Sequence, residues 1–291
     1  MMRRPSTRSL PPSHPGGFTL IEMIAVIVLT GLIAGVVALF IRAPVQGYVD
    51  SARRAEMADI ADTTLRRVTR DLRLALPNSV VVTNAGTQVA LDFLSTSGGG
   101  RYRASGTGAG GCGAAGDSLD FAAADTCFEI TGPAVNFQAG DQVVVYNLGA
   151  AGANAYSGYA APTDVRRAYD VATGGTGPRT VVRLLSTSAL PFESPSQRFH
   201  VVNEQVRYLC DTATGNLTRY WGFAIAAPPA TPTVPAGGNN ALLASRISAC
   251  SFAYNANVVT QRAGLVTMLL TVTSGGESVS LYNATHVSNV P

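Results

Sequence analysis

A chain of 291 residues, of which 46% are hydrophobic, is long enough for one sizeable folded domain plus an additional element. All its basic side chains are arginine, and Arg3, Arg4 and Arg8 precede the first apolar run; removing these three takes the formal charge from +3 to zero. Because a nucleic-acid-binding protein is expected to show a strongly basic face, this balance argues against nucleic acid as a partner.

The first element is an uncharged apolar run, residues 23–41. At a rise of about 1.5 Å per residue, a helix of this length is close to one bilayer thickness, so it can span a membrane. An ordinary secretory signal has a shorter apolar core followed by a small-residue cleavage site. Here the distinctive junction precedes the apolar run, which predicts that a leader is removed and the helix stays.

That junction reads GGFTLIE over residues 16–22. It resembles the prepilin class, which comprises the type IV pilins and the pseudopilins of type II secretion. The resemblance implies that residues 1–17 are a leader, that prepilin peptidase cuts after Gly17, and that Phe18 becomes the N-methylated first residue. Glu22 then takes the place of the acidic residue four positions later.

Glu22 is also unusual on physical grounds, because a carboxylate at the edge of an apolar helix is unfavourable in lipid unless something neutralises it. In the resembled family, the neutralising group is the N-terminal amine of a neighbouring subunit, so the charge pair forms when a subunit docks into the filament. This implies an assembly role for Glu22. The alternative is that Glu22 lies at the headgroup level, as polar residues flanking membrane helices do.

A second half of the helix is predicted at residues 48–76, so that the whole helix covers 18–76 with residues 18–41 as its transmembrane and assembly half. Many members of the class carry a helix-kinking proline late in the apolar run, but the first proline here is Pro44, so any bend is expected near that residue. Pro77 follows the last apolar position and ends the helix. The apolar positions spaced for one face are Met57, Ile60, Ala61, Leu65, Val68, Leu72 and Leu76.

Arginines and acidic residues alternate along this second half. The arginines could bind anionic lipid or a partner helix, but the interleaved acidic residues favour a solvated face. The arginines are Arg53, Arg54, Arg66, Arg67, Arg70 and Arg73, and the acidic residues are Glu56, Asp59, Asp62 and Asp71.

Residues 77–291 are expected to form a β-rich head, since short β-prone runs alternate with glycine, proline and asparagine. The helix and an antiparallel sheet beneath it give an α+β fold, the lollipop layout of the resembled family. Two stretches, 98–116 and 226–240, are predicted to be surface loops. Strands are predicted at 79–83, 88–94, 142–147, 180–186, 197–203, 204–210, 217–225, 247–254 and 265–273.

Four cysteines, Cys112, Cys127, Cys210 and Cys250, all follow the membrane segment. If that segment places them outside the cytoplasm, disulfides are the expected state. Of three possible connectivities, the favoured one pairs the first two and the last two, because each bond would then close a loop. The cysteine spacings include no CxxC-type pair of ligands for zinc, so no metal site is predicted.

No recognisable catalytic constellation occurs, so the chain is not expected to be an enzyme or to carry a cofactor. His200 lies in a β-prone run and is expected to be an ordinary strand residue. Acidic residues are loosely grouped in the head, but their spacing does not establish a calcium site. They are Asp117, Asp120, Asp125, Glu129 and Asp141.

The C-terminal passage 247–291, the run 201–210 and the helix 53–80 resemble minor pilin-like proteins of the mannose-sensitive hemagglutinin (MSHA) pilus, of the biogenesis protein O type. This resemblance implies a minor pilus subunit that acts in initiation and assembly. It is expected in the inner membrane with a periplasmic head, and then in the pilus at the cell surface, with prepilin peptidase and other pilins as partners. The alternatives are a minor pseudopilin of type II secretion and a pilus-borne adhesin, whose site could include Tyr102, Tyr156, Tyr159 and Trp221.

Overall fold

The computed structural model describes residues 16–106, 112, 116–158, 161–186, 188–256 and 263–291. The chain divides into two compact units, one ending at Arg53 and the other spanning Arg54–Pro291. The predicted leader, residues 1–17, lies almost wholly outside the described residues. The long helix α1, Leu20–Leu72, contributes to both units.

In the first unit, α1 carries the apolar run. It is long and apolar enough to span a bilayer, and no residue of its most apolar window is buried. The helix continues through Pro44, whose ring nitrogen cannot donate the usual helical hydrogen bond. An apolar surface of this length is unfavourable in water, which fits a segment that lies in lipid or packs against other helices.

In the second unit, α1 buries the predicted apolar stripe in the largest core of the head. Met57, Ala61, Leu65, Val68 and Leu72 are all less than 4% exposed, and they pack with side chains from strands far along the chain. The spacing of four and three residues keeps these side chains on one face of the helix. The prediction that this half packs its stripe on a β-structure is therefore confirmed.

The helix ends at Leu72, before the predicted 76, because the backbone leaves it to join the sheet. Leu74 and Ala75 make turn-like hydrogen bonds three residues back, to Asp71 and Leu72. The Leu76 amide then donates to the Leu94 carbonyl at 2.8 Å. Strand pairing has replaced the helical pattern at this point, although Leu76 is still buried.

All strand pairs named in the described structure are antiparallel. The largest sheet follows the order β1-β2-β9-β5-β6-β8-β3, and β10 pairs with both β9 and β11. A second sheet has the order β12-β13-β14, and a small one pairs β4 with β7. The bounds are β1 Val81–Ala85, β2 Gln88–Arg101, β3 Cys127–Glu129, β4 Val135–Phe137, β5 Gln142–Val145, β6 Arg166–Tyr169, α2 Val171–Gly174, β7 Gly177–Arg179, β8 Val181–Leu185, β9 Arg198–Asp211, β10 Asn216–Phe223, β11 Asn239–Ala244, β12 Ile247–Asn255, β13 Ala263–Ser274 and β14 Glu277–Ser288.

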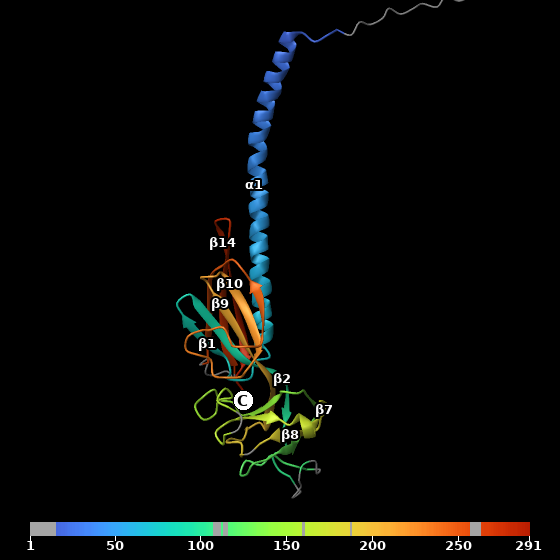
Figure 1. Ribbon diagram of the computed structural model, residues 1–291, viewed down its shortest axis with the longest axis vertical. Coiled ribbons are helices and arrows are strands. Elements are labelled where there is room, and N and C mark those ends of the chain that lie inside the picture. The colour runs from blue at the N-terminus through green and yellow to red at the C-terminus, as the bar shows by residue number, and fades with distance from the viewer. Residues whose placement is uncertain (1–15, 107–111, 113–115, 159–160, 187, 257–262) are drawn as a thin grey trace, which may run out of the picture. The chain divides into compact units, whose positions relative to one another are not determined.

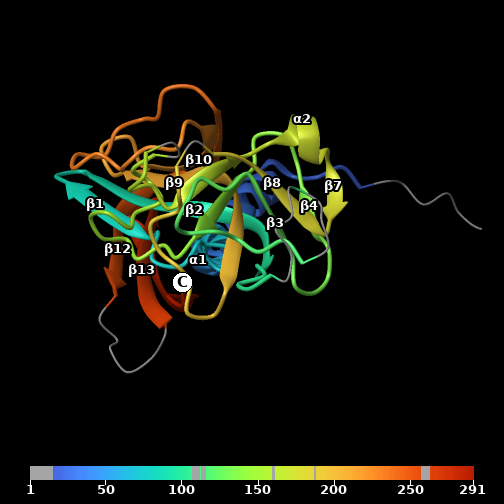
Figure 2. The same ribbon diagram turned by 90° about the horizontal axis from the view of Figure 1, so that it is seen from below.

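The head has two main hydrophobic cores, and β9, a 14-residue strand that pairs with β2, contributes side chains to both. One end of this strand pair, with Phe93 and Tyr208, packs with α1, β12 and β13. The other end, with Phe199 and Val201, packs with the short strands β3, β4, β5 and β8. Figure 1 shows the second half of α1 alongside β9 and β10, and Figure 2 shows the short strands grouped together near β7.

Two sequence predictions about strands and loops are wrong, and a third differs only at its end. The predicted strands 197–203 and 204–210 form the single strand β9, because pairing with β2 continues on both sides of the register shift at Glu204 and Val202. The predicted loop 98–116 begins as strand, since Gly98, Gly99 and Gly100 still belong to β2. The predicted loop 226–240 is open chain only until β11 begins at Asn239.

That second loop is fastened to the sheet by a buried polar group. The Arg207 guanidinium donates to Asp92 Oδ1 at 2.8 Å and to the Thr233 carbonyl at 2.7 Å, and Gln205 Oε1 accepts from the Ala226 amide at 3.0 Å. Burial raises the pKa of the Asp92 carboxyl, and the Arg207 charge opposes that rise. A loop rich in alanine and proline thus stays close to the sheet without large apolar side chains of its own.

The cysteines pair as the sequence favoured. Cys112 bonds to Cys127, and Cys210 bonds to Cys250, with Cα atoms 5.4 Å and 6.6 Å apart. The second bond joins β9 of the large sheet to β12 of the three-stranded sheet, so it links two layers around the main core. Both bonds fit a domain that folds in an oxidising compartment.

Candidate functional site

The predicted cleavage junction lies just before the first residue of α1. Gly16, Gly17, Phe18 and Thr19 are exposed and have no regular structure. No heavy atom lies within 4 Å of a Cβ built on either glycine, and Phe18 is 76% exposed. An unpacked segment of this kind is accessible to a peptidase, as cleavage at this position requires.

Thr19 is the residue that starts the helix. Its Oγ1 accepts a hydrogen bond from the Glu22 amide at 3.3 Å, and its carbonyl accepts from the Glu22 and Met23 amides, both at 3.1 Å. These contacts satisfy amides that have no partner inside the helix. Sequence reasoning missed this role of Thr19, although T-x-x-E before an apolar run is the capping-box pattern.

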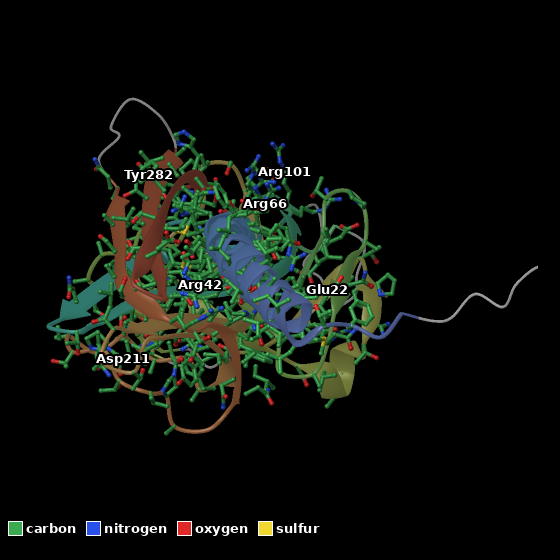
Figure 3. The ribbon with its side chains drawn as sticks, turned by 90° about the horizontal axis from the view of Figure 1, so that it is seen from above. Glu22, Arg42, Arg66, Arg101, Asp211 and Tyr282 are labelled. Atoms are coloured by element: carbon green, nitrogen blue, oxygen red, sulfur yellow. A yellow bond between two sulfur atoms is a disulfide. The ribbon has the colours of Figure 1, made fainter. Side chains whose placement is uncertain are left out.

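Glu22 is in the first turn of α1, where the positive end of the helix dipole favours a carboxylate. Its residue is exposed, and its carboxylate has no hydrogen-bond or ion-pair partner among the residues that the structure describes. Figure 3 looks along α1 from this end and shows Glu22 beside it. The surrounding side chains are apolar and also exposed, including Ile21 at 72% and Met23 at 53%.

The hydroxyl of Thr30, within the apolar run of α1, is satisfied inside the helix. Thr30 Oγ1 donates to the Val26 carbonyl at 2.7 Å, so its hydroxyl needs no outside partner. Leu29, Leu32 and Phe40 are 60%, 65% and 78% exposed. This surface offers no specific chemistry, but it can pack against lipid or against another apolar helix.

The charged face of the second half of α1 is only partly solvated. Arg66 pairs with Asp62 at 2.6 Å, and both side chains are largely exposed, as predicted for a solvated face. Asp71 differs, because its side chain is 12% exposed and its Oδ2 accepts from Tyr208 Oη at 2.7 Å and from Arg219 Nε at 2.8 Å. Asp71 therefore fastens the helix to β9 and β10.

Of the aromatic residues considered for an adhesive site, the two tyrosines that the structure describes are buried. Tyr102 and Tyr156 are 1% and 4% exposed, and their hydroxyls bond to the Ser194 carbonyl and the Ser79 carbonyl respectively. The Trp221 ring lies under the Arg219 guanidinium, 4.6 Å from the ring centroid. Tyr159 lies outside the described residues. Tyr102 and Tyr156 are therefore core residues and do not line a surface site.

The acidic residues of the head mostly bond to nearby backbone or arginine groups. Asp141 Oδ2 accepts from the Gln138 amide at 2.7 Å, and Glu129 pairs with Arg103 at 2.8 Å. The Arg103 hydrogen bond lowers the pKa of Glu129, whereas burial raises that of Asp141. Within the described part of the chain, no group of three histidine, cysteine or acidic side chains is placed to hold a metal ion.

Comparison with known proteins adds one finding. The family model described as the prokaryotic N-terminal methylation motif matches residues 13–38, a span that includes Gly17, Phe18 and Glu22. No curated protein and no solved structure matches the chain.

The methylation motif, the apolar helix that follows it and the antiparallel β head together support a type IV pilin-like or pseudopilin-like protein. Such a protein is anchored in the membrane by a single helix and has other pilins as partners. The matched span lies entirely in the first unit. The head must therefore be interpreted from its own residues.

Proposed function

We propose that this chain is a minor subunit of a type IV pilus of the MSHA type, and that it acts in the initiation and assembly of the filament. Prepilin peptidase would cleave between Gly17 and Phe18 and methylate the new N-terminus. The protein would then be held in the inner membrane by α1, with the head in the periplasm, before it enters the filament. No catalytic role is proposed.

The observation that carries this proposal is the position of Glu22. It is exposed, has no partner among the described residues, and lies in the first turn of an apolar helix, within the matched methylation motif. A carboxylate at the centre of a membrane helix is unfavourable by about 2.5–3.5 kcal/mol, so even at the edge a partner cation lowers the free energy. After cleavage, the amine of Phe18 on a neighbouring subunit is such a cation.

The exposed apolar side chains between Leu20 and Val49 would provide the remaining contacts. In lipid, they gain little by packing against another helix, so Glu22 is the group whose environment changes most on docking. A charge pair worth only about 1.4 kcal/mol would change the affinity of docking tenfold. Orientation and register would then follow from this one pair, and the surface of the head would select the neighbouring subunits.

The first test is a Glu22→Leu variant, with Glu22→Asp as the matched control that keeps the charge. We expect Glu22→Leu to be cleaved normally, as mass spectrometry of the N-terminus would show, and to be recovered in sheared pili at less than about a tenth of the wild-type amount. Glu22→Asp should be incorporated much better than Glu22→Leu. Normal incorporation of Glu22→Leu would refute the assembly mechanism.

The second test is a clean deletion of the gene, scored for surface pili by electron microscopy and for extracellular enzymes in the culture supernatant. Loss of pili with normal secretion supports the proposed function. Loss of secretion with intact pili would instead identify a type II pseudopilin. If both are normal and only surface adherence falls, an adhesin is the better interpretation.

A further inference from the structure

A pocket in the head is built around the outer ends of β2 and β9. Its volume is about 380 Å³, within the range of sites that hold small molecules. None of its residues belongs to the predicted processing or assembly site. The lining residues are Gly99, Gly100, Arg101, Ile130, Thr131, Pro133, Arg198, Phe199 and His200.

The floor of the pocket includes Gly99 and Gly100 of β2, at a position where β2 pairs with β9 and not with β1. Gly99 lies opposite His200, and Gly100 lies opposite Phe199. A Cβ on Gly99 would come within 2.8 Å of the Phe199 carbonyl oxygen, and one on Gly100 would come within 3.0 Å of the Phe199 ring. Glycine normally weakens a strand, so its use here indicates a place where other groups approach the backbone closely.

Two arginines stand directly opposite each other at this floor. Arg101 of β2 is the cross-strand partner of Arg198 of β9, and both are exposed. Like charges directly opposite on an antiparallel pair are destabilising. Neither has an ion-pair partner among the residues that the structure describes, whereas Arg103, two positions along, pairs with Glu129 at 2.8 Å.

His200 adds an unsatisfied polar atom on the same face of β9 as Arg198. Its Nε2 is buried and has no hydrogen-bond partner in the described structure. Burial, and then the charge of Arg198, lower the pKa of His200 to about 4, so its ring is neutral at neutral pH. A neutral imidazole can donate or accept one further hydrogen bond at the pocket.

The apolar wall that a ligand can reach is Pro133, because Ile130 and Phe199 also line the pocket but are only 4% and 0% exposed. Guanidinium groups bind carboxylate, sulfate and phosphate through paired N–H donors, and an apolar wall suits the carbon skeleton of the molecule that carries such a group. Figure 3 shows Arg101 at the periphery of the head, where a ligand from solution can reach it.

The geometry points to an oxyanion-binding site between Arg101 and Arg198, which takes the carboxylate, sulfate or phosphate of a compact ligand about the size of an acidic sugar residue. The oxyanion relieves the repulsion of the two guanidinium groups, and the rest of the ligand lies against Pro133. This site is independent of the proposed filament role, because it lies in the head and uses no residue of the N-terminal motif.

The test is isothermal titration calorimetry on the full-length processed protein in neutral detergent and in a low-salt chloride buffer. Glucuronate is the acidic-sugar probe, inorganic sulfate and phosphate are the oxyanion-only probes, and glucose is the uncharged control. We expect saturable binding of glucuronate and none of glucose. Binding of glucuronate that is tighter than that of the inorganic anions supports the apolar wall, and equal binding places the recognition in the arginines alone.

The decisive variant is Arg101→Gln with Arg198→Gln. It should bind glucuronate at least tenfold more weakly, while Arg66→Gln, which removes one charge from an exposed helix position, should bind normally. The double variant should unfold at the same temperature as the wild type or higher, because it removes a repulsion. Failure of every anion to bind, unchanged affinity in the double variant, or binding of a single-stranded oligonucleotide without glucuronate would overturn the proposal.

Discussion

Replacing His200 should remove a large part of the acid sensitivity of the head. In the folded chain, the pKa of His200 is lowered from its ordinary value of 6.5 to about 4, first by burial and then by the charge of Arg198. A lowered pKa means that the folded state favours the neutral ring. The stabilisation is therefore present above about pH 6.5 and is lost as the pH falls toward about 4.

The size of the effect follows from the two pKa values. Each unit of difference corresponds to about 1.36 kcal/mol, so the full difference is about 3.4 kcal/mol at low pH. Between about pH 7.5 and about pH 4.5, the free energy of unfolding should fall by about 2.5 kcal/mol through His200 alone. Carboxylates such as Asp92 also titrate in acid, so only a comparison with a variant isolates this contribution.

The assay is urea denaturation of the full-length protein in neutral detergent, followed by the fluorescence of Trp221, the single tryptophan of the chain. A His200→Gln variant should lose about 2.5 kcal/mol less than the wild type over that pH change. His286→Gln is the control, because His286 is an exposed histidine on β14. If wild type and His200→Gln lose the same free energy of unfolding over this pH change, the inference that His200 is buried as a neutral ring is refuted.

Two further predictions concern the packing of the head, and urea denaturation measures both. Replacing both cysteines of the β9–β12 disulfide with serine should lower the free energy of unfolding by about 4 kcal/mol, because that bond closes 40 residues, against about 3 kcal/mol for Cys112–Cys127, which closes 15. Leu72→Ala should be destabilising by about 2–5 kcal/mol, since Leu72 is 1% exposed, and Leu74→Ala, at 52% exposed, should change stability by less than about 0.5 kcal/mol. A reversed order in either pair would contradict the packing described.

The helix and its buried stripe were predictable because their signal is local. Met57, Ala61 and Leu65 recur at helical spacing, and a single face of the helix needs no knowledge of what it packs against. The end of the helix was less predictable. Leu76 continues the same spacing, but its amide bonds to Leu94 of β2, a partner that only the folded chain reveals.

The short strands of the second core escaped sequence reasoning for a different reason. β3, β4 and β7 have three residues each, too few to show an alternating pattern. β14 is longer, but its exposed positions carry serine, alanine and tyrosine, so alternation of polarity is weak there. The glycines at 98–100 were predicted to lie in a loop, because their place in a strand depends on the close approach of β9, which the sequence does not show.

The pocket at Arg101 and Arg198 could not be predicted from the sequence either, because it also depends on contacts between distant segments. The two residues are far apart in the sequence, and only the register of β2 against β9 makes them opposite neighbours. By contrast, Gly17, Phe18 and Glu22 lie in one short motif, so their grouping could be recognised without a fold. Thr19 belongs to that motif as well. Its Oγ1 accepts a hydrogen bond from the Glu22 amide, which explains a hydroxyl residue at this position.

The division between local and long-range information bears on function. Pilins and pseudopilins share the N-terminal junction, so the residues that adapt this chain to one machine must lie in the head. Two buried arginines of the head are satisfied internally, Arg207 by Asp92 and Arg219 by Asp71. Arg101 and Arg198 are held together without a counter-charge among the described residues, and evolution could remove that repulsion with one substitution. A substitution there that changes what the head binds, while cleavage after Gly17 and entry into the filament continue, would separate the specific role of this subunit from the assembly chemistry of its class.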